Sequence, residues 1–114
     1  MIKLREAIRG VDTTVHHLVP VPACCPATNN PLAGSTLIVS YRPDGVVMPV
    51  EALSAMVNEY QGGHPDVREM EAMIQHIALR VVSVVKVRVR VRADLAIQPP
   101  YGGPTQRMVV SVVV

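Results

Sequence analysis

The pattern that decides the fold is Val85-Lys86-Val87-Arg88-Val89-Arg90-Val91-Arg92, in which valine alternates with a basic residue. Successive side chains of a β-strand point to opposite faces of its sheet. The alternation, which we expect to begin near Val81, therefore predicts a strand with one apolar face and one basic face. Such a strand needs a layer of helices or a second sheet to cover its valines.

Two helices are predicted upstream of this strand. Leu53, Met56, Val57 and Tyr60 recur at helical spacing, after Pro49 and before the glycines at 62 and 63. A second helix is expected to open near Pro65 and Asp66. Its apolar stripe consists of Val67, Met70, Met73, Ile74, Ile77 and Val81.

Three further strands complete the predicted order. The first two span about residues 9–21 and 33–42, and the last spans 108–114 after a turn rich in Pro and Gly at 99–104. The order is β-β-α-α-β-β, which predicts an α+β fold with an antiparallel sheet and two helices on one face. No internal repeat or linker interrupts it, so residues 1–114 are expected to form a single domain.

Composition narrows the class of protein. The formal net charge of +2 is too small to indicate a nucleic-acid binder by itself, and the chain has neither Phe nor Trp. The only cysteines, Cys24 and Cys25, are adjacent and cannot form the loop-closing disulfides of a secreted scaffold. No apolar run is long enough to span a membrane and no signal peptide is recognised, which predicts a soluble, cytoplasmic protein with no membrane partner.

The segment Cys25-Pro26-Ala27-Thr28-Asn29-Asn30-Pro31 places a thiol in a Pro-rich loop just before the predicted strand at 35–44. A cysteine acts as a nucleophile when cations, a helix N-terminus or backbone donors lower its pKa. A buried, inert cysteine is the alternative. Cys24 is expected to be a bystander or the partner in a vicinal disulfide.

This loop and the following strand resemble those of the QueF family, in which a cysteine attacks the nitrile of 7-cyano-7-deazaguanine. The element order is similar to the tunnelling fold (T-fold) of that family, in which several subunits join their sheets into a barrel with the helices outside. The resemblance implies that Cys25 is the catalytic nucleophile of a homo-oligomer with shared active sites. It also places the basic face of the sheet toward the tunnel, whereas a solvated charged face is the alternative.

The resemblance extends to a second short motif. The family carries a His-Glu pair on a helix after the cysteine, and its glutamate binds the guanine-like edge of the base; the equivalent pair here is Arg68-Glu69. A carboxylate suits that edge because its two oxygens accept hydrogen bonds from a ring N–H and an exocyclic amine. Thr28, Arg68 and Glu69 are thus the predicted substrate-binding residues. The alternative for Glu69 is a first-turn residue favoured by the helix dipole alone.

Two departures from the nitrile reductases of the family predict that NADPH is not used. The lysines that hold NADPH at the start of the first helix are missing from residues 49–54, and Tyr101-Gly102-Gly103 lacks the arginine of the reductase motif. The chain is therefore most similar to the unimodular archaeosine synthases. These enzymes act on 7-cyano-7-deazaguanine already in tRNA, form a cysteine thioimide and add ammonia, with no other cofactor. For such a substrate, the predicted RNA contacts are Lys86, Arg88, Arg90 and Arg92.

A third departure concerns proton transfer. Leu32 lies seven residues after Cys25, where the family usually carries an aspartate that protonates the nitrile nitrogen. His16 and His17 are the predicted replacements, because imidazole can exchange a proton near neutral pH. The two are adjacent on a predicted strand and point to opposite faces, so at most one can serve.

Three other functions are compatible with the sequence. One is an NADPH-dependent nitrile reductase, and another is a non-catalytic RNA-binding T-fold protein in which Leu32 marks lost chemistry. The third is a zinc enzyme like the cyclohydrolases and pterin synthases, with His16, His17, Cys24 and Cys25 as ligands. Adjacent pairs are poorly spaced for joint ligation, so no metal is predicted.

Overall fold

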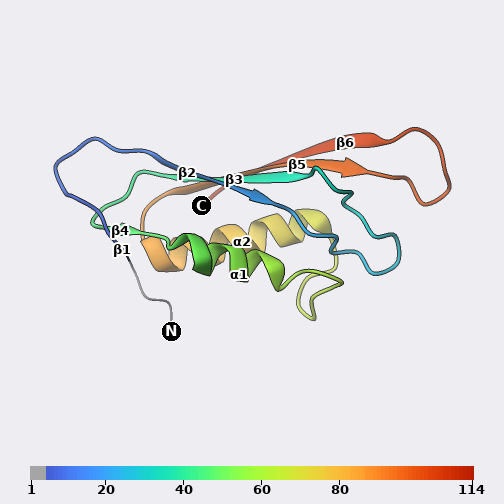
Figure 1. Cartoon of the computed structure of the whole chain (residues 1–114), viewed down its shortest axis with the longest axis horizontal. Coiled ribbons are helices and arrows are strands. Elements are labelled where there is room, and N and C mark those ends of the chain that lie inside the picture. Colours follow the sequence, from blue (N-terminus) through green and yellow to red (C-terminus); the bar gives the residue numbers. More distant parts are fainter. Residues whose placement is uncertain (1–4) are drawn as a thin grey trace.

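The protein folds as a four-stranded antiparallel sheet with two helices on one face (Figure 1). The computed structural model describes residues 5–114. In spatial order the strands are β2 (Val15–Pro20), β3 (Thr36–Tyr41), β5 (Val89–Ile97) and β6 (Gln106–Val113). The helices are α1 (Val50–Asn58) and α2 (Met70–Val85). The predicted α+β class and the order β-β-α-α-β-β of these main elements are confirmed.

Two very short strands add to the predicted elements. β1 (Arg5–Glu6) and β4 (Val46–Val47) pair antiparallel to each other, and β4 leads directly into α1 (Figure 1). Strands of two residues are too short for a period of two to be read from the sequence. They tie the start of the described chain to the connection between β3 and α1.

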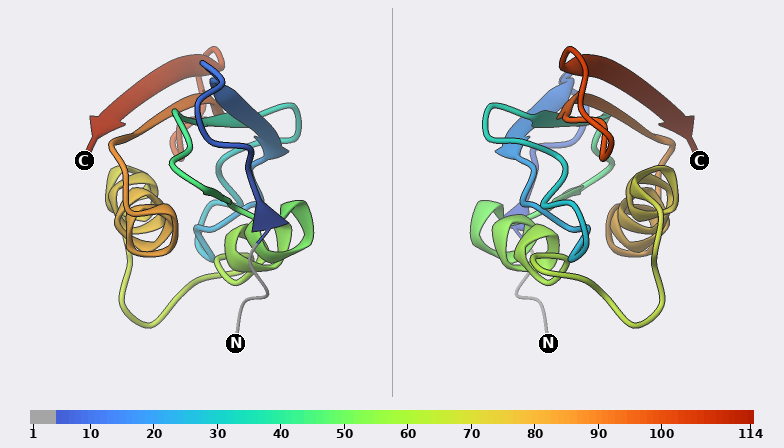
Figure 2. Two further views of the ribbon diagram at one scale, coloured as in Figure 1. Left: turned by 90° about the vertical axis from the view of Figure 1, so that its left-hand side faces the viewer. Right: turned by 90° about the vertical axis from the view of Figure 1, so that its right-hand side faces the viewer.

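The strand β5 has the two faces that its alternating sequence predicts. Val89 and Val91 are completely buried, whereas Arg90 and Arg92 are exposed. Figure 2 shows the twisted sheet as one layer and the two helices as the other. The valines therefore face the helices, and the arginines face away from them.

The boundary between α2 and β5 was predicted wrongly. α2 continues to Val85, and Lys86 ends it in the left-handed conformation with φ 56°, donating its N–H to the Val82 carbonyl at 2.9 Å. Val81 and Val85 fit a helical stripe with Ile77 as well as they fit a period of two, so the sequence pattern is ambiguous here. Lys86 consequently lies at the helix end, apart from the arginines of the strand.

Other ends also differ from the prediction. The first strand begins at Val15, because Gly10 turns the chain with φ 81° and residues 11–14 lie exposed. α2 begins at Met70 instead of near Pro65, because residues 64–69 form a turn closed by an isolated bridge between His64 and Val67. Glu69 is therefore the N-cap residue of α2 and not a member of its first turn.

The core lies between the sheet and the helices. It includes the fully buried side chains of Leu37, Tyr60, Ile77 and Leu95. The opposite face of the sheet has no layer over it within residues 5–114, and Leu18 on that face is 72 % exposed. Neither helix among the described residues is long and apolar enough to cross a membrane.

Candidate active site

The loop that carries the cysteines connects β2 to β3 and is fastened at its base to the end of β5. The Leu32 N–H donates to the Ala96 carbonyl at 2.8 Å, and the Ala96 N–H donates to Ser35 Oγ at 2.9 Å. The Val21 N–H donates to the Ser35 carbonyl at 3.0 Å, which closes the neck of the loop. Residues 21–35 therefore form a loop whose base is held to β5 by hydrogen bonds.

Asn30 is the centre of this loop, and no pattern in the sequence indicates its role. Its buried side chain pairs with the backbone of Gln98: Nδ2 donates to the carbonyl and Oδ1 accepts from the N–H, both at 2.9 Å. Its own carbonyl accepts the N–H groups of Cys24 and Cys25, each at 3.0 Å. Both cysteines are thus positioned through one residue that is held to the sheet.

Cys25 has the surroundings of a reactive thiol. Its side chain is partly exposed, and hydrogen bonds from the Thr28 hydroxyl, then from the backbone of Thr28 and of Ala27, lower its pKa. The charge of Glu69 acts in the opposite direction and is the smallest contribution. Thr28, predicted to bind substrate, therefore lies beside the nucleophile, where it favours the thiolate.

Cys24 has different surroundings from its neighbour. It is half-buried, and this burial raises the pKa of its thiol. Both cysteines are free thiols in the structure, with no vicinal disulfide between them. At a given pH, Cys25 is therefore the more ionised and the more accessible of the two.

The cysteine loop and the α1–α2 connection, which ends at Glu69, contact each other within one chain. The charges of Glu69 and Glu71 disfavour the thiolates of Cys25 and Cys24, respectively. The Gly62 N–H, on the α1–α2 connection, donates to the Ala23 carbonyl at 2.8 Å. Gly63 lies so near that an added Cβ would be 3.7 Å from the Pro26 side chain.

The carboxylate of Glu69 is exposed and makes no capping hydrogen bond to the helix that it precedes. The helix therefore does not hold this side chain by the bond that an N-cap residue usually forms. Arg68 is exposed next to it and has no ion pair within the described chain. Both side chains are therefore accessible to a ligand.

The two candidate proton donors lie elsewhere. His16 Nδ1 is 2.7 Å from Ser40 Oγ on the open face, and His17 Nε2 is 2.9 Å from the Tyr41 hydroxyl on the other, as adjacent strand residues must. Burial lowers the pKa of His17. Pro20, four residues on, is already about 13 Å from His16 at the usual rise of a strand, and the cysteine loop continues beyond it (Figure 1). Within one chain, neither histidine is brought to Cys25.

No protein-family model matches the sequence, and a search of curated proteins found no match either.

The zinc alternative has no assembled site in one chain. Two of its four proposed ligands, His16 and His17, lie on β2, and the other two lie in the loop that follows it. Across residues 5–114, no group of three or more His, Cys, Asp or Glu side chains is arranged to hold a metal ion.

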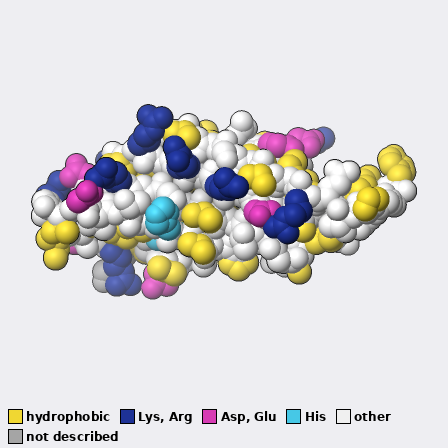
Figure 3. Space-filling model, turned by 90° about the horizontal axis from the view of Figure 1, so that it is seen from above, with side chains coloured by type: hydrophobic (Ala, Val, Ile, Leu, Met, Phe, Trp, Pro, Cys, Tyr) yellow, Lys and Arg dark blue, Asp and Glu magenta, His cyan; other side chains and the backbone are white. Residues whose placement is uncertain are grey.

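The open face of the sheet carries the predicted basic stripe. Arg88, Arg90 and Arg92 are exposed there and form no ion pair within the described residues. Figure 3 looks onto this face and shows basic side chains with apolar ones between them. A hollow of about 470 Å³ lies at one end of it. It is lined by Thr14, His16, Ser40, Tyr41, Arg42, Val87, Arg88, Arg90 and Val113.

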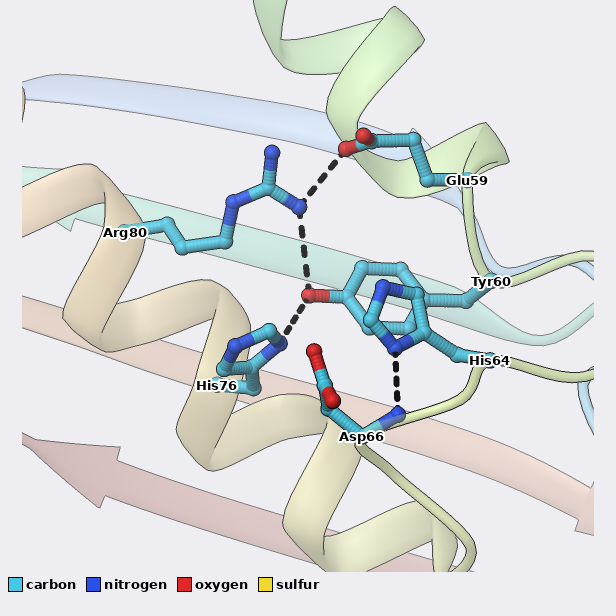
Figure 4. A network of polar contacts seen from close by, with 6 residues as sticks. All are labelled: Glu59, Tyr60, His64, Asp66, His76 and Arg80. Carbon is cyan, nitrogen blue, oxygen red and sulfur yellow. Dashed lines mark hydrogen bonds and ion pairs between the residues drawn. The ribbon is translucent and has the colours of Figure 1, made fainter.

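A polar network on the helix side was missed by the sequence analysis. The hydroxyl of the buried Tyr60 is 2.5 Å from His76 Nδ1 and accepts a hydrogen bond from Arg80 at 3.4 Å (Figure 4). Arg80 also pairs with Glu59 at 2.6 Å. The ring of His64 stacks on Tyr60 with the centroids 4.7 Å apart. These residues come from three segments, and no local pattern in the sequence predicts that they contact one another.

Replacing Thr28 by Val should raise the pKa of Cys25, because the hydroxyl that stabilises its thiolate is removed. The rate of Cys25 alkylation by iodoacetamide, followed against pH, should rise at a higher pH in Thr28→Val than in the wild type. Thr28→Ser keeps the hydroxyl and should retain the original profile. Identical profiles for the Val and Ser variants would contradict the proposed hydrogen bond.

Proposed function

We propose that the protein is a T-fold amidotransferase that converts 7-cyano-7-deazaguanine in tRNA to the formamidine base archaeosine, with Cys25 as nucleophile. The observation that carries the proposal is a partly exposed thiol of lowered pKa in a loop that contacts the connection leading to Glu69. The similarity of residues 25–44 and 68–69 to the QueF family supplies the substrate. Archaeosine synthesis takes place in the cytoplasm, which is where we propose that the protein acts.

The reaction has two steps that balance without a redox cofactor. The Cys25 thiolate attacks the nitrile carbon, and its lone pair forms the new C–S bond. One C–N π bond breaks, its electron pair goes to the nitrogen, and the nitrogen takes up a proton to give a thioimide. Ammonia then adds to the same carbon, the C–S bond breaks, and the thiol is restored as the formamidine leaves. Thr28 and the loop backbone stabilise the sulfur when it is an anion, both before attack and after displacement.

The nitrile nitrogen needs a proton, and Leu32 cannot supply it. The Leu32 N–H is already used by the Ala96 carbonyl, and its side chain has no acidic group. Since Cys25 is partly exposed, we propose that water carries the proton between the thiol and the nitrogen. A histidine from a second subunit is the other route that the resemblance to barrel-forming proteins allows.

Base recognition is assigned to Glu69. Its two oxygens can accept hydrogen bonds from the ring N–H and the exocyclic amine of the deazaguanine, while the nitrile points to Cys25. Arg68, exposed beside it, is suited to a neighbouring phosphate because its guanidinium is always charged. Residues 49–54 have no cation to hold the phosphates of NADPH, which favours ammonia over hydride as the second reactant.

A barrel of several copies is part of the proposal. β2 and β6 are the two edges of the sheet and pair with no strand on their outer sides within the described chain. Antiparallel pairing of β6 with the β2 of a second copy would extend the sheet, as in the T-fold. The open face would then line the tunnel.

The test uses tRNA that contains 7-cyano-7-deazaguanine, incubated with the protein and either ammonium or NADPH. Mass spectrometry of the nucleosides should show the formamidine with ammonium and no new base with NADPH. An aminomethyl product that requires NADPH would make the protein a nitrile reductase. Binding of the tRNA without either product would favour a non-catalytic RNA-binding protein. The observation behind this alternative is Leu32, which stands where the family usually has an acidic residue.

The arginines of the open face should contribute to RNA affinity through phosphate contacts. Arg90→Ala and Arg92→Ala should each weaken tRNA binding about three- to tenfold and lower the slope of log K against log salt by about one. Arg9→Ala is the matched control, because Arg9 is an exposed arginine outside the strands of the sheet and is paired with Asp44. Equal losses of tRNA affinity in all three variants would show that the net charge of the protein, and not this face, determines binding.

A further inference from the structure

The hollow on the open face of the sheet contains a row of three polar residues with the smallest one at its centre. His16 of β2 pairs in register with Ser40 of β3, and Ser40 pairs with Arg90 of β5. Since neighbouring strands lie about 4.8 Å apart, the backbones at His16 and Arg90 are separated by about 10 Å. The short side chain of Ser40 therefore leaves a depression between two larger side chains, and all three residues line the hollow.

The hollow has an excess of positive charge. Besides His16 and Ser40, its polar lining includes Thr14, Arg42, Arg88 and Arg90. Arg42 forms an ion pair with Asp12, whereas Arg88 and Arg90 form none within residues 5–114. No acidic side chain of the described residues is part of the lining. Two guanidinium groups without a counter-charge thus border one cavity, which favours an anionic ligand.

The pair of His16 and Ser40 can donate a hydrogen bond to such a ligand in every protonation state. His16 Nδ1 is 2.7 Å from Ser40 Oγ. When the serine hydroxyl donates to Nδ1, the ring hydrogen is on Nε2 and is not used within the pair. When Nδ1 donates to the serine oxygen, the hydroxyl hydrogen is not used within the pair. Phosphate oxygens accept hydrogen bonds of this kind and also pair with arginine.

The hollow has room for more than a phosphate group. Its volume of about 470 Å³ lies within the range of about 300–1,000 Å³ that is typical of small-molecule sites. Val87 and Val113 add apolar surface to its wall. A ligand that carries a phosphate on an organic group therefore matches the lining better than a free ion does.

We propose that this hollow binds the phosphate monoester of a small molecule of nucleotide size, and that Arg88, Arg90 and the His16–Ser40 pair hold the phosphate. A monoester carries a charge of about −1.5 to −2 at neutral pH, which matches two guanidinium groups. No residue of the cysteine loop is part of the lining. The site is therefore separate from the proposed reaction at Cys25.

The test is a titration of ¹⁵N-labelled protein with adenosine 5′-monophosphate, followed by the NMR signals of the backbone and of the arginine side chains. Saturable shifts are expected at the residues of the hollow, and inorganic phosphate should shift the same residues with lower affinity. Adenosine, which lacks the phosphate, should give no saturable shift at these concentrations. Arg90→Ala should weaken binding of adenosine 5′-monophosphate at least about tenfold, because a charge-assisted hydrogen bond is lost.

Arg92→Ala is the matched control. Arg92 is exposed on the same face of β5, two residues from Arg90, has no ion pair within the described residues and does not line the hollow. Both variants lose one positive charge, so an effect of net charge alone would be equal in the two. Binding by Arg92→Ala should stay within about twofold of the wild type.

Ser40→Leu tests the shape of the hollow without changing its charge. The larger side chain should fill the depression between His16 and Arg90 and prevent binding. Ile38, two residues earlier in β3 and partly exposed, shows that the same face of this strand accommodates a large aliphatic side chain. Circular dichroism checks that the variant folds, and the comparison of the two arginine variants decides the matter if it does not.

Three results would overturn the proposal. The first is no saturable shift with either adenosine 5′-monophosphate or inorganic phosphate, and the second is an equal loss of binding in Arg90→Ala and Arg92→Ala. The third uses an RNA oligonucleotide with hydroxyl groups at both ends, which contains only phosphodiesters. If it shifts the residues of the hollow and adenosine 5′-monophosphate does not, the hollow belongs to an RNA-binding surface. None of these measurements involves the nitrile base or Cys25, so their outcome is independent of the amidotransferase reaction.

Discussion

Replacing Cys25 by Ala should reduce formamidine formation at least about a thousandfold, because the covalent intermediate cannot form without the sulfur. Initial rates with nitrile-containing tRNA and saturating ammonium measure this loss. Cys24→Ala is the matched control: it removes the adjacent thiol, whose pKa is raised by burial, and should keep the rate within about threefold of the wild type. The two variants compare the sulfur atom of Cys25 with the sulfur atom of the adjacent cysteine.

The reverse order of effects would reject the assignment. Activity that survives in Cys25→Ala and disappears in Cys24→Ala would make the half-buried thiol the nucleophile. Loss in both variants, with intact folding by circular dichroism, would indicate that the pair acts together. Neither result is expected, because hydrogen bonds from Thr28 and Ala27 lower the pKa of Cys25, whereas burial raises the pKa of Cys24.

The second large effect concerns stability. Leu37→Ala should lower the free energy of unfolding by about 2–5 kcal/mol, because the side chain is completely buried in β3 and leaves a cavity between the sheet and the helices. For a single domain with a total of about 5–15 kcal/mol, this is a large fraction. Urea unfolding followed by circular dichroism measures it.

Leu18→Ala is the control for that experiment. Leu18 lies on the open face of the neighbouring strand β2 and is 72 % exposed, so its loss should change stability by less than about 0.5 kcal/mol in the isolated chain. A loss as large as that of Leu37→Ala would mean that the open face is covered, as it would be in an oligomeric barrel. Repeating the unfolding at several protein concentrations would separate that case from a monomer.

Much of the fold could be predicted from the sequence because its periods are clear. The alternation through Arg88–Arg92 fixed the two faces of β5, and the stripes of α1 and α2 placed them under the sheet. The boundary at Val81–Val85 was predicted wrongly, since valines spaced by four satisfy both periods. The β1–β4 pair has too few residues for either period to appear.

The residues of the candidate site could be predicted only where they belong to a recognisable sequence motif. Cys25 and Glu69 were singled out by motifs in two separate segments, and the structure shows that the loop carrying Cys25 contacts the connection that ends at Glu69. Asn30 and Tyr60 act through contacts with residues far away in the sequence, which no local pattern encodes. His16 and His17 were selected for their chemistry alone, and the direction of β2 carries them away from the thiol.

The most direct test of the central claim is intact-protein mass spectrometry after incubation with free 7-cyano-7-deazaguanine or nitrile-containing tRNA, with ammonium left out. We predict an adduct of one base per chain that maps to the peptide containing Cys25, persists in Cys24→Ala and is released when ammonium is added. No adduct under these conditions, or an adduct that remains in Cys25→Ala, would contradict the account of Cys25 as the nucleophile of a nitrile-modifying enzyme.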